Sequence, residues 1–178
     1  MSLVPGRWHL FGAKLNFTAV TTTTNQVLGF GLGSVDTTIV AAIEEYIGFW
    51  KDADTALDFR IRNDNAATYT NDGLATVAGA TEYVLEFAVN VAASGQTGRV
   101  IAWLNEIDSN GYVVNITRLF DATSVALPVT SEALTLTFFA QSAAGSATAI
   151  TVNWDYVDAF IGRNPGAGPV LVPGLYSA

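Results

Sequence analysis

The stretch TEYVLEFAVNV, residues 81–91, places its most apolar side chains at every second position. One side of an extended chain would carry Tyr83, Leu85, Phe87, Val89 and Val91. The opposite side would carry the polar residues Glu86 and Asn90. A period of two is typical of a strand that buries one face. The stretch therefore predicts a β-strand lying over a hydrophobic core.

Similar alternation recurs on both sides of this stretch, in KLNFTAV (14–20), TALDFRIRN (55–63), GRVIAWLNEI (98–107), GYVVNITRL (111–119), ALTLTFFAQ (133–141) and ATAITVNWDYV (147–157). Turn residues separate the later stretches, at Ser94-Gly95, at residues 108–111 and at residues 144–146. We expect Ile101, Trp103 and Ile107 to face the core, and Trp154 likewise. Closely spaced strands with such turns predict an all-β fold, an antiparallel jelly-roll β-sandwich.

Two segments before residue 55 are less regular. SVDTTIVAAIEEYIGFW (34–50) has an apolar stripe at helical spacing after a cap at Asp36, although its β-branched residues suit a strand. We favour one short helix there, followed by a strand. LGFGLGS (28–34) has a glycine at every second position but no lysine for a phosphate, which favours a flexible or bulged edge strand.

The two ends of the chain do not fit the sandwich pattern. Pro5, Gly6 and Gly12 interrupt residues 1–12, and prolines and glycines recur through residues 162–178. We therefore expect an N-terminal arm (1–12), a β-sandwich domain (13–161) and an extended C-terminal arm (162–178). Arms need a partner surface to offset the entropy of ordering them. The predicted subunit-interface residues are Trp8, Leu10, Phe11, Val170, Leu171, Val172, Leu175 and Tyr176.

Composition excludes several classes of function. The chain has no cysteine and a single histidine, His9, which argues against thiol chemistry, a Ser-His-Asp triad and a histidine-bearing metal cluster. A net charge of −8, with no cluster of Lys and Arg, argues against nucleic-acid binding. No apolar run is long enough to span a membrane. The N-terminus lacks the layout of a signal peptide, so we expect assembly in a host cytoplasm.

Three stretches together resemble a known group of folds: TEYVLEFAVNVAASG (81–95), SEALTLTFFAQSAAGSA (131–147) and ATAITVNWDYVDAF (147–160). Their order is similar to that of jelly-roll carbohydrate-binding modules and the wider galactose-binding-like sandwiches, over about residues 80–161. The same fold is used in viral (phage) structural proteins. The resemblance implies a β-sandwich, but a fold shared so widely does not select one role.

Candidate chemical groups are few. We expect Glu82, Glu86, Glu106 and Glu132 to lie on solvated strand faces, and we identify no catalytic, cofactor-binding or metal-binding residues. Modules of the resembled type hold a structural calcium ion, for which Asp52, Asp54, Asp58, Asp64, Asn65, Asn71 and Asp72 offer oxygens, but the EF-hand spacing is absent. The candidate glycan contacts are Trp50, Tyr69, Asn71 and Tyr112.

These observations lead to two hypotheses of different kinds. The first is a non-enzymatic structural component of a virion, such as a capsid decoration, capsid or tail protein. Its arms would bind copies of itself or a major capsid or tail protein. The alternative is a carbohydrate-binding module, carried on a virion surface or acting alone. The second hypothesis predicts a concave face lined by exposed tyrosine or tryptophan side chains. Silence on a glycan array, together with burial of Trp103 and Tyr112, would dismiss it.

Overall fold

The computed structural model describes residues 2–17, 26–34, 44–51, 56–63, 66–77, 81–128, 133–142 and 152–161. Its ten strands are β1 (Trp8–Phe17), β2 (Gln26–Gly33), β3 (Tyr46–Lys51), β4 (Ala56–Asn63), β5 (Ala66–Thr76), β6 (Glu82–Val91), β7 (Thr97–Ile107), β8 (Val113–Ala126), β9 (Thr135–Ser142) and β10 (Val152–Ile161). None of the described residues is helical, so none forms a helix that could cross a membrane.

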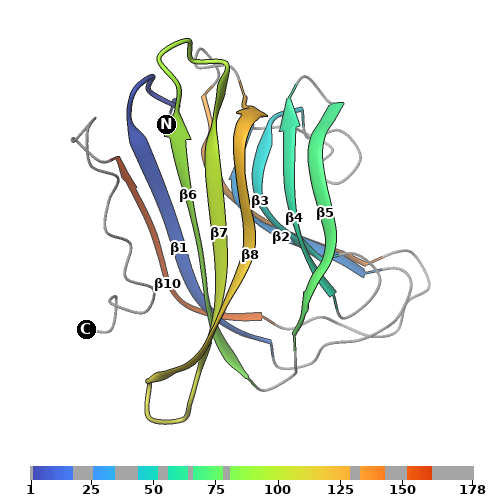
Figure 1. The fold of residues 1–178 in the computed structure, drawn as a ribbon. Coiled ribbons are helices and arrows are strands. Elements are labelled where there is room, and N and C mark those ends of the chain that lie inside the picture. Colours follow the sequence, from blue (N-terminus) through green and yellow to red (C-terminus); the bar gives the residue numbers. More distant parts are fainter. Residues whose placement is uncertain are drawn as a thin grey trace.

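The strands form two antiparallel sheets that pack face to face (Figure 1). The first sheet has the order β10-β1-β6-β7-β8, and the second has the order β5-β4-β3-β2-β9. The predicted all-β sandwich is therefore confirmed. Every ladder between neighbouring strands is antiparallel, from β1 with β10 to β7 with β8.

Aromatic rings from both sheets meet in the core between them. Phe87 of β6 lies across from Phe49 and Phe59 of the second sheet, with ring centroids 6.1 and 5.5 Å apart. Phe120 of β8 stacks on Phe59 at 5.4 Å. The alternation of residues 81–91 fits this arrangement, because all five of its predicted inward side chains belong to the core. Buried aromatic pairs of this kind contribute beyond their buried area, so the core fixes the position of both sheets.

The turn between β7 and β8 extends beyond the end of the sandwich (Figure 1). Gly111 has φ of 85°, a left-handed conformation that glycine adopts without strain. Asp108 accepts hydrogen bonds from the backbone N–H groups of Asn110 and Tyr112, both at 2.9 Å. This local network closes the turn, as the Asp-Ser-Asn-Gly sequence predicted.

The expectation of an N-terminal arm over residues 1–12 is wrong from Trp8 onward. Trp8–Phe17 is strand β1, which lies inside the first sheet between β10 and β6. Phe11 belongs to the core, and Leu10 is buried against its own chain, so neither is available to a neighbouring subunit. Pro5 and Gly6 form a turn before β1. Proline and glycine therefore mark the entry into a central strand here.

Two further expectations change in the second sheet. Tyr46 and Trp50, which fitted a helical stripe, lie in strand β3, while residues 35–43 lie outside the described residues. The glycine-rich strand β2 is not an edge strand, because it pairs with β3 on one side and β9 on the other. At Gly31 and Gly48 the two backbones approach so closely that a Cβ atom on either would clash with the neighbouring strand.

Candidate functional site

The face of the first sheet that points away from the core is called here the outer face. Three rows of register partners cross it from β1 through β6 and β7 to β8. They are Leu10–Ala88–Ile101–Asp121, Gly12–Glu86–Trp103–Arg118 and Lys14–Val84–Asn105–Ile116. Charged, aromatic and amide side chains thus lie side by side on the outer face of the sheet.

Trp103 lies on this outer face, contrary to the expectation that it faces the core with Ile101. In β7 the buried inward residues are Val100, Ala102 and Leu104, whereas Ile101 and Trp103 are half-buried. Both alternate sets are apolar, so a period of two could not tell one face from the other. The half-buried indole lies in register between Glu86 and Arg118.

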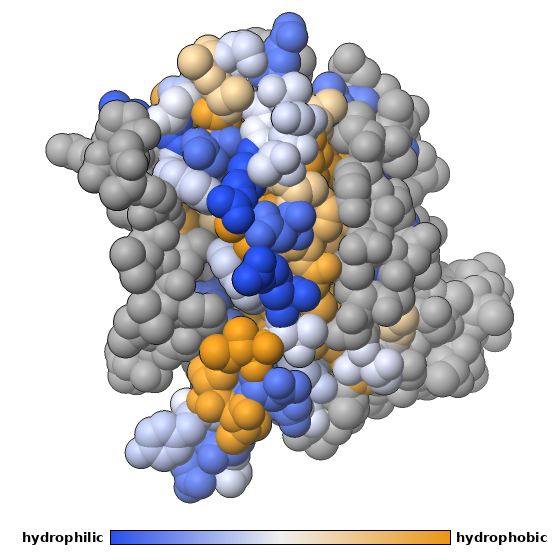
Figure 2. All heavy atoms as spheres, in the orientation of Figure 1, coloured by the Kyte–Doolittle hydropathy of each residue, from blue (hydrophilic) through white to orange (hydrophobic). Residues whose placement is uncertain are grey.

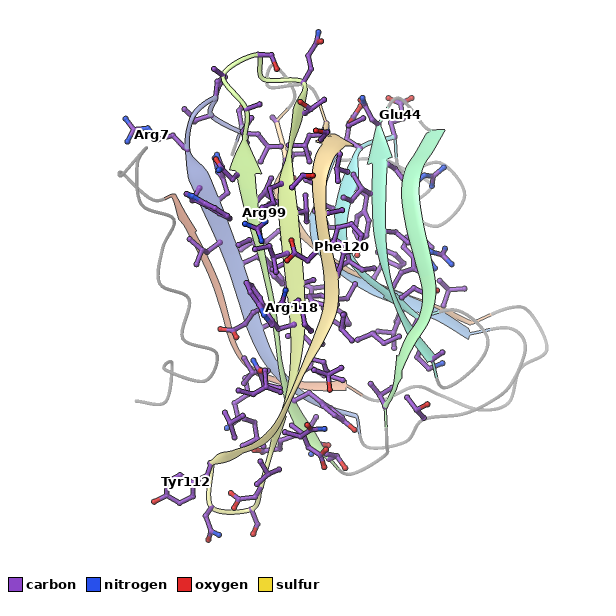
Figure 3. The ribbon with its side chains drawn as sticks, viewed as in Figure 1. Arg7, Glu44, Arg99, Tyr112, Arg118 and Phe120 are labelled. Carbon is purple, nitrogen blue, oxygen red and sulfur yellow. The ribbon has the colours of Figure 1, made fainter. Side chains whose placement is uncertain are left out.

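A cluster of three charges lies beside Trp103, where one carboxylate binds two guanidinium groups. Arg99 donates from Nε to Oδ1 of Asp121 and from Nη2 to Oδ2, each at 3.0 Å. Arg118 donates from Nη1 to Oδ2 of Asp121 at 2.9 Å. The hydrogen bonds from Arg99 lower the pKa of Asp121 and raise that of Arg99. In Figure 3, Arg99 and Arg118 both lie in front of the first sheet.

A buried carboxyl and amide lie under the same face. Asn105 donates from Nδ2 to Oε2 of Glu86 at 2.7 Å, and the two residues are 0% and 6% exposed. Gly12 is the register partner of Glu86 on β1, and a Cβ atom there would make only an ordinary contact, 3.8 Å from Cγ of Glu86. Burial raises the pKa of Glu86. The expectation that Glu86 is solvated is therefore wrong, although its outward position on the strand was foreseen.

The projecting end of β8 is apolar and exposed. Tyr112 is 71% exposed, and Val114 and Ile116 follow it at alternate positions with more than half of their surface accessible. Figure 2 shows a hydrophobic patch at this end of the first sheet, next to the charged middle of the outer face. In Figure 3 the Tyr112 side chain points away from the body of the protein. Exposed apolar groups gathered on one element are typical of a contact surface.

The predicted glycan contacts separate in the structure. Trp50 is only 3% exposed, because its ring packs against Phe139 at 4.7 Å and lies under the guanidinium of Arg60, also at 4.7 Å. Trp50 is therefore wrong as a surface contact. The side chains of Tyr69 and Asn71 lie outside the described part of the structure, and so both stay predictions. Tyr112 is accessible, as a glycan contact would require.

Most residues predicted for the C-terminal arm and for a calcium site lie outside the part of the chain that the structure describes. Val170, Leu171, Val172, Leu175 and Tyr176 lie outside the described residues, so the C-terminal arm stays a prediction. Asp58 is buried and pairs with Arg60 at 3.1 Å. Where the structure describes the chain, no group of three or more His, Asp or Glu residues is placed to hold a metal ion. The side chains of the other proposed calcium ligands lie outside it.

Comparisons with known proteins identify the fold of this chain but do not identify a family. No family model and no curated protein matches the sequence. Among solved structures, the chain is similar to endo-β-1,4-glucuronan lyase from the fungus Trichoderma reesei, at 13% identity and a TM-score of 0.56, covering 87% of this chain and 68% of the other. It is also similar to the alginate lyase of Aplysia kurodai, at 10% identity and a TM-score of 0.56, covering 89% and 71%.

A third similar structure is sheep galectin-11, at 13% identity and a TM-score of 0.46, covering 90% of this chain and 93% of the other. At such identities the lyase likenesses show the fold alone, a β-sandwich. The resemblance seen in the sequence is thus supported for the sandwich. The viral role, the virion localisation and the absence of catalysis stay predictions.

Proposed function

We propose that this chain is a carbohydrate-binding module that contacts a glycan with the outer face of its first sheet. The observation that carries the proposal is the accessibility of two aromatic side chains of the first sheet, Trp103 and Tyr112. Trp103 lies in register with the polar Arg118, and Tyr112 lies at the turn before β8. Sugar rings bind by stacking on aromatic faces while their hydroxyl groups bond to polar neighbours. Aromatic side chains and polar groups, the two parts of such a site, are both present on the first sheet.

The accessibility of Tyr112 and Trp103 bears directly on the choice between the two hypotheses. Burial of both residues would have counted against glycan binding, and neither is buried. Two of the similar structures are named as lyases of glucuronan and alginate, which are polysaccharides. Those names describe the other proteins, so the proposal depends on the side chains of this one. The virion hypothesis depends mainly on residues 162–178, and the described residues add no support to it.

The proposal is tested by binding a panel of neutral and acidic oligosaccharides to the complete chain. We expect at least one glycan to bind, and Tyr112→Ala and Trp103→Ala to weaken that binding about tenfold each, as loss of a stacking surface should. Leu136→Ala is the matched control, because Leu136 is an exposed apolar residue in the second sheet. A protein that binds no member of the panel, or binds equally well with both aromatic side chains removed, contradicts the proposal.

A further inference from the structure

Arg118 is held by Asp121 through one edge of its guanidinium, and its other edge has no partner among the residues that the structure describes. Its Nη1 atom donates to Oδ2 of Asp121, three residues further along β8. Its Nε and Nη2 atoms have no hydrogen-bond partner in the described part of the protein, and its side chain is 62% exposed. An arginine fixed by one carboxylate in this way loses little conformational freedom when it binds another group.

The neighbouring arginine shows what such an edge binds. Arg99 uses Nε and Nη2 together to hold both oxygens of Asp121, at 3.0 Å each. This paired contact matches the planar geometry of a carboxylate. The same two atoms of Arg118 are not used by Asp121, and the Arg118 side chain is exposed on the same face. The cluster also carries two guanidinium groups for one carboxylate, so an excess of positive charge remains although the chain as a whole has a net charge of −8.

An apolar surface continues from Arg118 along the same strand. Ile116 lies two residues before it and Val114 two residues before that, while Tyr112 lies at the turn just before β8; all three are exposed. Side chains two residues apart on one face of a strand are separated by about 7 Å. That spacing is comparable with the length of one sugar unit. A sugar ring could therefore lie on Ile116 while a group attached to the ring reaches Arg118.

We propose that the outer face selects acidic sugars, those that carry a carboxylate on the ring, and that Nε and Nη2 of Arg118 bind this carboxylate as a pair. The inference rests on the proposed glycan binding and names its ligand class. Neutral sugars would lack the charge that the Nε and Nη2 edge of Arg118 attracts. Sulfated sugars would offer a tetrahedral group in place of the planar one that Arg99 already holds in this protein.

The test is calorimetric titration of the complete chain with three oligosaccharides of equal length. These are an oligoglucuronate, the matching neutral oligoglucoside and a sulfated oligoglucoside. The wild type should bind the oligoglucuronate at least about tenfold more tightly than either of the others. Arg118→Gln should remove this preference, and Arg118→Lys should remove most of it, because lysine keeps the charge but not the paired donors. Arg62→Gln, which removes a positive charge from the second sheet, should change nothing.

The outcomes distinguish failure of the acidic-sugar inference from failure of the proposed glycan binding. Equal binding of the neutral and carboxylated ligands, or an undiminished preference in Arg118→Gln, overturns the acidic-sugar inference while glycan binding stands. Tighter binding of the sulfated ligand overturns the assignment to a carboxylate. Binding of no glycan in the wider panel overturns the proposed function and the inference together. Arg118 is exposed, so its variants should fold, and an unchanged melting temperature checks that they do.

Discussion

Asn105 donates a hydrogen bond from Nδ2 to Oε2 of Glu86 across 2.7 Å, and both residues are buried although they lie on the outer face of the first sheet. The other amide atom of Asn105, Oδ1, is buried and has no hydrogen-bond partner among the described residues. A carboxylate in this position can accept from Nδ2 but cannot donate to Oδ1. The pair therefore leaves the amide oxygen of Asn105 unsatisfied, and Glu86 carries an acid into a place that favours its neutral form.

The substitution Glu86→Gln should stabilise the protein at neutral pH. Glutamine removes the buried acid, keeps an oxygen to accept from Nδ2 of Asn105, and adds an N–H group that can donate to Oδ1. We expect a gain of about 1 kcal/mol, which corresponds to a rise in Tm of roughly 2–4 °C. Glu82→Gln is the control on the same strand, because Glu82 is partly exposed and pairs with Lys14. A Tm for Glu86→Gln below that of the wild type would show that the buried carboxyl does not destabilise the protein.

The same substitution should change how stability depends on pH. The unfolded carboxyl has its ordinary pKa of 4.5, and burial raises the pKa of Glu86 in the folded protein. The folded state therefore holds a proton that the unfolded state has lost, and the contribution of Glu86 to stability falls as pH rises from 4.5 through the folded value. Urea unfolding between pH 4 and 8 should show the advantage of Glu86→Gln growing with pH. An advantage that does not vary with pH contradicts the raised pKa.

His9 should give the opposite dependence of stability on pH, a loss of stability as pH falls. Its Nε2 atom accepts from the backbone N–H of Val4 at 2.9 Å, its ring is buried, and burial lowers its pKa below the ordinary value of 6.5. The folded state thus prefers the neutral ring, and stability present above pH 6.5 is lost as pH falls toward the folded value. His9→Gln keeps an acceptor for Val4 but cannot take up a proton. Its Tm should fall less than that of the wild type between pH 7 and 5, and parallel profiles would refute the assignment.

The glycines where β2 meets β3 should not tolerate a methyl group. A Cβ atom on Gly48 would come 2.6 Å from the carbonyl oxygen of Phe30 and 2.8 Å from the hydroxyl of Tyr46. Because the first of these atoms belongs to the backbone, the strands must separate, and we expect Gly48→Ala to cost about 1–3 kcal/mol. Gly12→Ala is the matched control, since its Cβ atom would make only an ordinary contact with Glu86. Chemical denaturation of both variants gives the comparison, and equal losses would contradict this account.

Strand positions were readable from the sequence where one face carries clearly larger apolar side chains than the other. Residues 81–91 alternate in this way, and β6 follows the prediction closely. The strand WHLFGAKLNF differs because Leu10 and Phe11 are adjacent and both buried, so it has no simple alternation. Trp103 was assigned to the wrong face for the same reason, because its strand is apolar on both. A central strand of a sandwich can carry such a sequence when its outer face is covered in part by neighbouring side chains.

The candidate site was less predictable than the fold. Arg99 and Asp121 are 22 residues apart, and only the register between β7 and β8 brings them together. That register contains three irregularities, so counting back from the turn at Gly111 does not give the pairing. Tyr112 could be proposed because an aromatic residue next to a turn is usually accessible. Trp50 could not be excluded from the sequence, because its burial depends on Arg60 and Phe139 from two other strands.

Binding of a glycan to the outer face of the first sheet can be located by recording backbone amide chemical shifts of the complete ¹⁵N-labelled chain during titration with the tightest-binding oligosaccharide. We expect the largest changes on β7 and β8, around Trp103, Tyr112 and Arg118, with little change in the second sheet. Changes confined to β2–β5, with β7 and β8 unaffected, would contradict it.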